Sequence, residues 1–186
     1  MQTIGLRLMT AHKVAVAKWD SKLDIIDPDR EDQVLQSCVQ QSKDMGLDPI
    51  WAQNFFKDQM EANVKLQMKL HEIWRKSGRR PDGPAVNLTA EIRPLIDRLN
   101  KEIILYSNQT KRLRESKSCP QIQDIIGEVM AKNLSMNAND MNAYGIAKQR
   151  ICLPVPISES TNGSKYFSFE AYFAAIIAFY FVLLFK

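Results

Sequence analysis

Two cations and two amides occupy positions that helical periodicity assigns to the protein interior. Arg7 and Lys18 are eleven residues apart, which is three helical turns, and they share the small, apolar stripe of an expected helix. Asn63 and Gln67 interrupt a second apolar stripe at i,i+4 spacing, so their side chains should converge. Side chains of these types can bind and orient an anion.

Two further cations stand on inward faces with few acids beside them. Arg30 precedes Val34 by one turn, and Arg93 lies beside the apolar stripe of a later helix. The inward acid near them is Glu31, since Asp27 is expected to cap a helix N-terminus. Because burying an unpaired cation costs several kcal/mol, these charges need compensation from another source.

Two interpretations compete for this set of residues. A single such cation more often reaches solvent along its apolar stem or joins an ion pair. Four cations and two amides on three or four helices instead favour a pocket for a multiply charged anion. A purely structural bundle would need all four cations to be exposed or paired.

Composition limits the class of protein to a helical domain. The chain has 186 residues, of which 45% are hydrophobic, and it contains few glycines and prolines, which suits one all-α domain with a core. The net charge is only +4 and no Lys/Arg run occurs, so we expect no nucleic-acid partner. Two histidines and three cysteines have no metal-ligand spacing, and we expect neither a metal nor a cofactor.

Six helices should position these side chains. Asp27–Pro28 and Asp48–Pro49 are start signals, with aspartate as the N-cap and proline at the first helical position. The expected helices span residues 2–20, 28–45, 49–76, 89–115, 121–134 and 137–150. Proline, serine and glycine after residue 152 indicate a linker.

Two cysteines bracket the last two expected helices. Cys119 and Cys152 are 33 residues apart, and a bridge between them would contribute roughly 3–4 kcal/mol by loop entropy. The alternative is two buried thiols. Cys38 lies on an apolar helix face and is expected in the core.

Several ordered motifs resemble a known family. They are LRLMTAHKVAVAKW, IDPDRE, LDPIWAQNFFKDQMEANVKLQ and LTAEIRPLIDRLN, together with the cysteine pair. Their order and gaps over roughly residues 5–156 resemble the all-helical AroQ-type chorismate mutases, and within them the secreted gamma subclass. The resemblance implies a roughly six-helix type II bundle over residues 1–156, then a linker at 157–170 and a hydrophobic tail at 171–186.

The resemblance also implies an enzyme that converts chorismate to prephenate by a Claisen rearrangement, without a nucleophile or cofactor. Position by position, it implies that Arg7, Arg30 and Arg93 hold carboxylates, while Lys18 and Gln67 donate to the ether oxygen. The alternative is a non-catalytic secreted or membrane-tethered effector or binding module of the same fold.

Three further positions complete the implied site. Glu31 should hold the substrate hydroxyl, with the backbone near Asp27 helping, and Asn63 should lie against a carboxylate. The resemblance implies Cys119–Cys152 as a subclass feature and a homodimer in which each chain builds its own pocket.

The resemblance implies a secreted or periplasmic location, although the first ten residues lack the features of a signal peptide. The apolar run from Ala171 to Phe185 allows three interpretations. It resembles a lipid-anchor signal, it could be a tail-anchored membrane helix, or it could arise from a shifted reading frame or a retained intron.

Overall fold

The computed structural model describes residues 1–154, so the expected linker at 157–170 and tail at 171–186 lie outside the described residues. Within residues 1–154 the chain is all-α and has no strand. The elements are α1 (Gln2–Ser21), α2 (Pro28–Asp44), α3 (Pro49–Ser77), the π-helical turn η1 (Leu88–Ile92), α4 (Arg93–Gln109), α5 (Lys111–Arg114), α6 (Cys119–Asn133) and α7 (Ala138–Lys148).

Aspartate caps start α2 and α3 where the sequence predicts them. The Asp27 side chain accepts from the backbone N–H of Arg30 at 3.2 Å, and Asp48 accepts from the N–H of Ile50 at 2.9 Å. A proline follows each cap at the start of the helix. At the other end of α3, Gly78 takes a left-handed conformation with φ 75°, which glycine adopts without a Cβ clash.

The single helix expected over 89–115 is wrong in detail, because three shorter elements replace it. Asn87 caps the first turn, and Pro94 has no N–H to extend an α-helical pattern back into that turn, which is π-helical. At the far end, the Thr110 hydroxyl donates to Tyr106 O at 2.7 Å, a local bond that competes with helix continuation. The short helix α5 follows, so residues 1–154 contain seven α-helices where six were expected.

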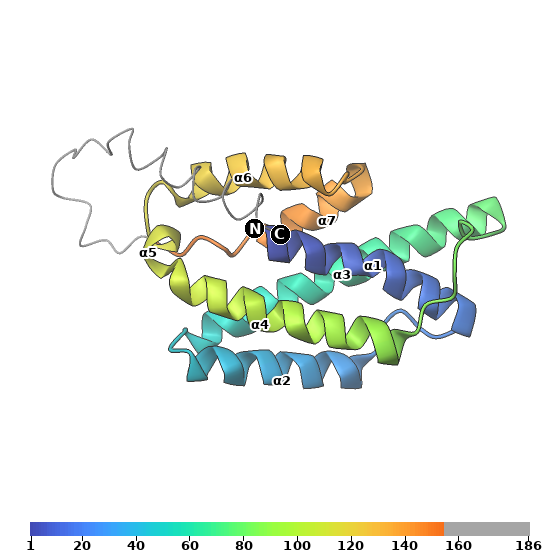
Figure 1. Ribbon diagram of the computed structural model, residues 1–186, viewed down its shortest axis with the longest axis horizontal. Helices are drawn as coiled ribbons and strands as arrows, with labels where there is room; N and C mark the ends of the chain where they lie inside the picture. Colours follow the sequence, from blue (N-terminus) through green and yellow to red (C-terminus); the bar gives the residue numbers. More distant parts are fainter. Residues whose placement is uncertain (155–186) are drawn as a thin grey trace, which may run out of the picture. The chain divides into compact units, whose positions relative to one another are not determined.

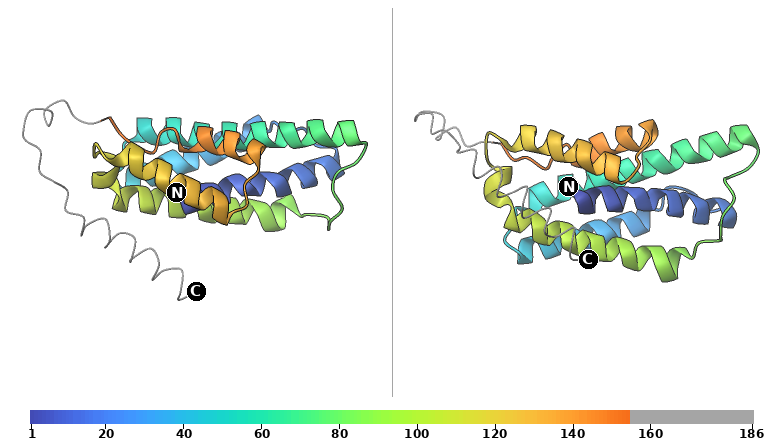
Figure 2. Two further views of the ribbon diagram at one scale, coloured as in Figure 1. Left: turned by 90° about the horizontal axis from the view of Figure 1, so that it is seen from above. Right: turned by 45° about the horizontal axis from the view of Figure 1, so that its top comes forward.

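The four long helices run lengthwise beside one another (Figure 1). α1 packs against α3 and α4, and α2 packs against α3 and α4. α7 packs on α3 and α1 and, with α6, covers the side of α1 away from α2, as Figure 2 shows from two further directions. This arrangement brings α1, α2, α3 and α4 around a common interior.

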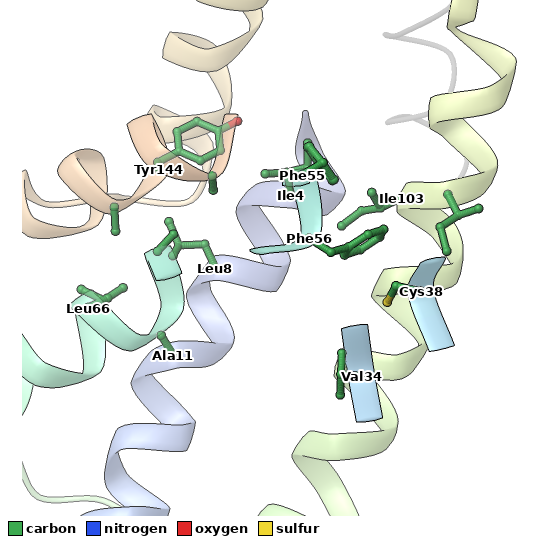
Figure 3. Packing of buried hydrophobic residues seen from close by; sticks show 14 of the residues in the cluster. Ile4, Leu8, Ala11, Val34, Cys38, Phe55, Phe56, Leu66, Ile103 and Tyr144 are labelled. Atoms are coloured by element: carbon green, nitrogen blue, oxygen red, sulfur yellow. The ribbon is translucent and has the colours of Figure 1, made fainter. Parts of the chain in front are cut away.

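The apolar core joins these helices on both sides of α1 and α3. Figure 3 shows Leu8 of α1 near Leu66 of α3, and Phe56 of α3 near Cys38 of α2 and Ile103 of α4. Each of these side chains is at most 3% exposed, so the expectation that Cys38 is a core residue is confirmed. Close packing of this kind fixes the helices to within small distances of one another.

A disulfide closes the α6–α7 hairpin. Cys119 and Cys152 are bonded, with 5.7 Å between their Cα atoms, which confirms the bridge over the alternative of two thiols. Beside it, the buried Arg114 donates to Ile151 O at 2.8 Å and stacks on the Trp51 ring. These contacts fasten the segment after α7 to the rest of the fold.

None of the helices within residues 1–154 combines the length and hydropathy that a membrane span requires.

Candidate active site

All eight polar residues singled out in the sequence line one cavity between α1, α2, α3 and the start of α4. They are Arg7, Lys18, Asp27, Arg30, Glu31, Asn63, Gln67 and Arg93. Aliphatic side chains make up the rest of the wall, from Val14, Ile25, Val34, Met60, Val64, Leu88 and Ile96. The volume is about 110 Å³, which suits a small ligand.

Arg7 is a buried cation held by neutral groups. Only 4% of it is exposed, and it donates from Nε to Asn100 Oδ1 at 2.7 Å and from Nη1 to Gln59 O at 3.0 Å. No carboxylate within residues 1–154 lies at ion-pair distance, and Nη2 has no hydrogen-bond partner there. Burial lowers the pKa of the guanidinium to about 10. The charge is therefore left available to an anion in the cavity.

Lys18 is held by a backbone carbonyl. It is 7% exposed, and Nζ donates to Ile25 O at 2.5 Å. Burial lowers the pKa of the ammonium below its ordinary value, while the nearby carboxylates of Asp27 and Glu31 oppose that shift. The ammonium thus has two further N–H donors at the cavity wall.

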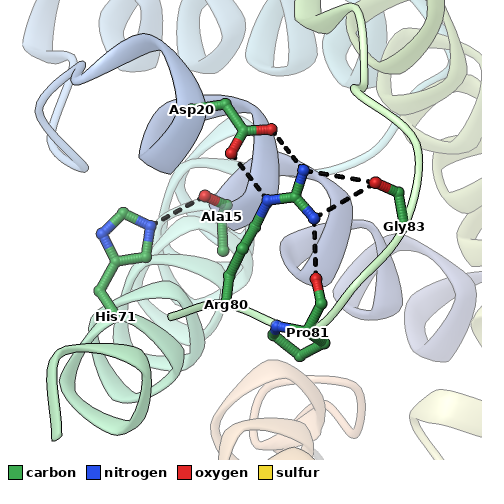
Figure 4. Close-up of polar contacts among 6 residues, drawn as sticks. All are labelled: Ala15, Asp20, His71, Arg80, Pro81 and Gly83. Atoms are coloured by element: carbon green, nitrogen blue, oxygen red, sulfur yellow. Dashed lines mark hydrogen bonds and ion pairs between the residues drawn. The ribbon is translucent and has the colours of Figure 1, made fainter. Parts of the chain in front are cut away.

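Polar contacts outside the cavity fasten the end of α1 that carries Lys18 (Figure 4). Arg80, in the loop after α3, meets Asp20 of α1 with two bonds of 2.7 and 2.8 Å, and this contact lowers the pKa of the Asp20 carboxyl. His71 of α3 bonds to Ala15 O at 2.8 Å. These contacts fix the register of α1 against α3.

Arg30 and Arg93 each have an acidic partner, unlike Arg7. Arg30 Nη2 lies 3.0 Å from Asp97 Oδ1, and Arg93 Nη2 lies 3.6 Å from Asp27 Oδ2. The expectation that hardly any acid stands near these cations is therefore corrected by Asp97, which lies four residues after Arg93. Between 30% and 50% of each of these four side chains is exposed, so the pairs are weak and a ligand carboxylate can exchange into them.

Asn63 and Gln67 meet as their spacing predicts. Gln67 Nε2 donates to Asn63 Oδ1 at 2.7 Å, and Asn63 Nδ2 donates to Thr10 Oγ1 at 3.5 Å. Gln67 Oε1 is buried and lacks a partner in the described part of the chain. A buried amide oxygen without a partner is costly, and this one belongs to a residue of the cavity wall.

The Glu31 side chain makes no hydrogen bond or ion pair within residues 1–154, so its carboxylate can accept from a ligand. Sequence reasoning missed the partners Asn100, Gln59 and Asp97. Asp97 and Asn100 follow Arg93 at i+4 and i+7, which places them on the same helix face as Arg93, but this spacing does not identify Arg30 and Arg7 as their partners.

The cavity lining is rich in cations and hydrogen-bond donors. Three guanidiniums, one ammonium and two amides face a site with two acids, and no serine, cysteine or histidine is among the lining residues. Over residues 1–154, no group of three or more histidine, cysteine or acidic side chains is placed to hold a metal ion. The arrangement can bind carboxylates and donate hydrogen bonds to a further oxygen.

Comparisons with known proteins point to one family. The family model "Chorismate mutase type II" matches residues 1–68, a range that contains every polar residue of the cavity lining except Arg93. A secreted chorismate mutase from Mycolicibacterium smegmatis is 31% identical over 98 residues, which is 53% of this chain and 54% of that protein. The chain thus aligns with only about half the length of that relative.

Two other relatives cover more of the chain. A secreted chorismate mutase from Mycobacterium tuberculosis is 24% identical over 150 residues, covering 81% of this chain and 75% of that protein. A crystal structure of a chorismate mutase from Burkholderia phymatum superposes with a TM-score of 0.79 at 32% identity, covering 82% of this chain and 93% of the other. The similarity therefore extends well beyond the residues that the family model matches.

Proposed function

The chain belongs to the chorismate mutase type II family, and on this premise we propose that it converts chorismate to prephenate by an intramolecular Claisen rearrangement. The observation that carries the proposal is the single cavity lined by four cations and two amides from α1, α2, α3 and the start of α4. Chorismate carries two carboxylates, an ether oxygen and a hydroxyl, and each has a complementary group in that cavity.

Three arginines would hold the two carboxylates. Arg7 offers its free Nη2, and Arg30 and Arg93 can exchange part of their exposed ion pairs for a ligand carboxylate. Arginine suits this role because its planar fork matches a carboxylate bidentately and stays charged. Holding both ends of an extended molecule in a folded shape lowers the entropic part of the barrier.

Lys18 and Gln67 would stabilise the transition state. As the C–O bond breaks, negative charge grows on the ether oxygen, and donors aimed at that oxygen are worth more in a dry site than in water. Lys18 is 7% exposed and Gln67 is 3% exposed, so both donors act in such an environment.

The remaining polar groups would fix the orientation of the ligand. The Glu31 carboxylate has no protein partner in residues 1–154 and can accept a hydrogen bond from the substrate hydroxyl. The backbone near Asp27 would help to hold the same hydroxyl. Asn63 has a second Nδ2 proton that can donate to a carboxylate.

We further propose that the chain acts outside the cytosol as a homodimer with a complete cavity in each chain. The relatives from the two mycobacterial species are named secreted, and the Cys119–Cys152 disulfide suits an oxidising compartment. The eight polar residues to which the proposal gives a role already meet in one cavity of a single chain, so the proposed site needs no residue from a partner.

The direct test is chorismate loss, followed by ultraviolet absorbance, with purified protein and the Arg30→Ala variant side by side. Loss that Arg30→Ala abolishes supports both the reaction and the arginine clamp. Arg98→Ala is the matched control, because Arg98 is 70% exposed on α4 and, among residues 1–154, pairs with Glu102 alone. A folded, helical sample without turnover would overturn the proposal in favour of a binding module.

A further inference from the structure

A chain of buried hydrogen bonds connects α1 to the amide of Gln67. Thr10 Oγ1 donates to Arg7 O at 2.6 Å, Asn63 Nδ2 donates to Thr10 Oγ1 at 3.5 Å, and Gln67 Nε2 donates to Asn63 Oδ1 at 2.7 Å. Thr10, Asn63 and Gln67 are 4%, 9% and 3% exposed, so water does not replace these bonds at low cost.

The direction of donation along this chain of hydrogen bonds follows from the one proton on the Thr10 hydroxyl. While that proton is donated to Arg7 O, Thr10 can only accept from Asn63, which must then turn Nδ2 toward it. Asn63 consequently presents Oδ1 to Gln67, and Gln67 spends one Nε2 proton on it. This direction leaves Gln67 Oε1 buried without a partner among the described residues.

The same three side chains can run in the opposite direction. If the Thr10 hydroxyl turns to donate to Asn63 Oδ1, then Asn63 Nδ2 can donate to Gln67 Oε1. Arg7 O still accepts the helical bond from the amide four residues later. The unpartnered oxygen is satisfied, and both Nε2 protons of Gln67 become available to a ligand. The reversal replaces all three bonds, among them the longest one, which joins Asn63 Nδ2 to Thr10 Oγ1 at 3.5 Å.

We propose that Thr10 is a positioning residue that sets the direction of this chain, and so decides whether Gln67 offers its carbonyl oxygen or both amide protons to the bound molecule. The inference rests on the proposed function, in which Gln67 must donate to an ether oxygen that becomes negative. Thr10 acts through Asn63 and is not itself a lining residue of the cavity.

The test removes and restores the hydroxyl. Thr10→Val should lower kcat for chorismate about five- to tenfold, the value of one hydrogen bond, with little change in KM. Thr10→Ser keeps a hydroxyl and should recover kcat to within about twofold. Thr3→Val is the matched control, since Thr3 is also buried, two turns earlier on the same helix, and should leave kcat unchanged.

Coupling to Gln67 separates this role from a packing defect. In a Gln67→Ala background, Thr10→Val should change kcat by less than about twofold, because the group that it positions is gone. An equal loss of kcat in both backgrounds, or a Thr10→Ser variant as slow as Thr10→Val, would overturn the inference.

A second readout needs no turnover. In Gln67→Glu protein without ligand, the pKa of the introduced carboxyl is measured by NMR with and without Thr10→Val. With Thr10 present, Asn63 can donate to the carboxylate while its own oxygen accepts from the hydroxyl, which lowers the pKa. Thr10→Val should raise that pKa by roughly half a unit to one unit.

An unchanged pKa of the introduced carboxyl would contradict the proposed role of Thr10, whether or not the protein consumes chorismate. A shifted pKa in the Gln67→Glu variant, together with no chorismate consumption by the unaltered protein, would instead overturn the proposed function and leave the proposed role of Thr10 intact.

Discussion

Arg30 Nη2 lies 3.0 Å from Asp97 Oδ1, so a cation proposed to clamp the substrate already has an acidic partner across the gap between α2 and α4. One nitrogen of the guanidinium is engaged in this contact, and the other N–H groups have no partner in residues 1–154. Asp97 can therefore hold the fork in place while the fork binds a second carboxylate.

The first prediction concerns the shape of this cation. Arg30→Lys keeps the charge but lacks the planar fork that can bind a substrate carboxylate bidentately while Asp97 holds its other edge, so we expect kcat/KM to fall by about 100-fold. Asp97→Asn removes only the orienting charge and should raise KM about fivefold with a smaller effect on kcat. Steady-state kinetics decide the matter, and near wild-type kcat/KM in Arg30→Lys would refute the bidentate role.

The second prediction concerns the buried ammonium. Lys18→Ala should lower kcat by roughly three orders of magnitude, because it removes the charged donor to the ether oxygen. Lys13→Ala is the matched control on the exposed face of the same helix. Rapid turnover by Lys18→Ala protein of unchanged melting temperature would show that the mechanism is wrong.

The third prediction is the pH profile of the unaltered protein. Burial lowers the pKa of Lys18 below its ordinary value, so the ammonium loses its proton earlier on the alkaline side than a solvated lysine does. We expect a nearly flat rate from mildly acidic to neutral pH, since Gln67 does not titrate, and a decline as pH rises through the lowered Lys18 pKa. A steep loss of turnover already above about pH 6 would contradict this assignment.

The fourth prediction changes Gln67 into a titrating group. A glutamate can donate to the ether oxygen only when it is protonated, so Gln67→Glu should be most active at acidic pH and lose activity as pH rises through the pKa of the introduced carboxyl. The measurement is kcat against pH for both proteins. A Gln67→Glu profile that matches the parent would mean that this side chain does not face the ether oxygen.

The fifth prediction concerns stability. Replacing both Cys119 and Cys152 by alanine should lower the free energy of unfolding by roughly 3–4 kcal/mol, because the unfolded chain regains the entropy of a 33-residue loop. Denaturant unfolding gives the value. A reductant should destabilise the parent protein but not the double variant, whose remaining cysteine, Cys38, is unbonded and buried.

Sequence patterns predicted the elements that local chemistry fixes. The starts of α2 and α3 follow from Asp27 and Asp48, whose caps form as expected. Gln67 and Asn63 meet because i,i+4 spacing brings side chains together within one helix. These features depend on residues that are close to one another in the sequence, so they can be predicted from it.

A local break in a helical pattern and the contacts between helices were not predictable in the same way. The break at Thr110 depends on a local hydroxyl bond that competes with an otherwise helical pattern. Asp97 as partner of Arg30, and Asn100 as partner of Arg7, depend on how α4 packs against α2 and α1. Helical spacing places Asp97 near Arg93 on its own helix, and only the packing of helices directs it to Arg30.

Arg7 has no acidic partner in residues 1–154. Its buried charge therefore lowers the stability of the protein without ligand and raises its affinity for a dianion. Replacing a buried charged group together with its polar partner by apolar side chains of similar volume is often neutral or stabilising. A double Arg7→Met, Asn100→Leu variant, in which Asn100 Oδ1 is not left buried without a donor, should therefore melt at a higher temperature while losing its ligand. Mutation alone would thus favour a sturdier, inactive descendant, and Arg7 would persist only for as long as selection acts on the chemistry of the cavity.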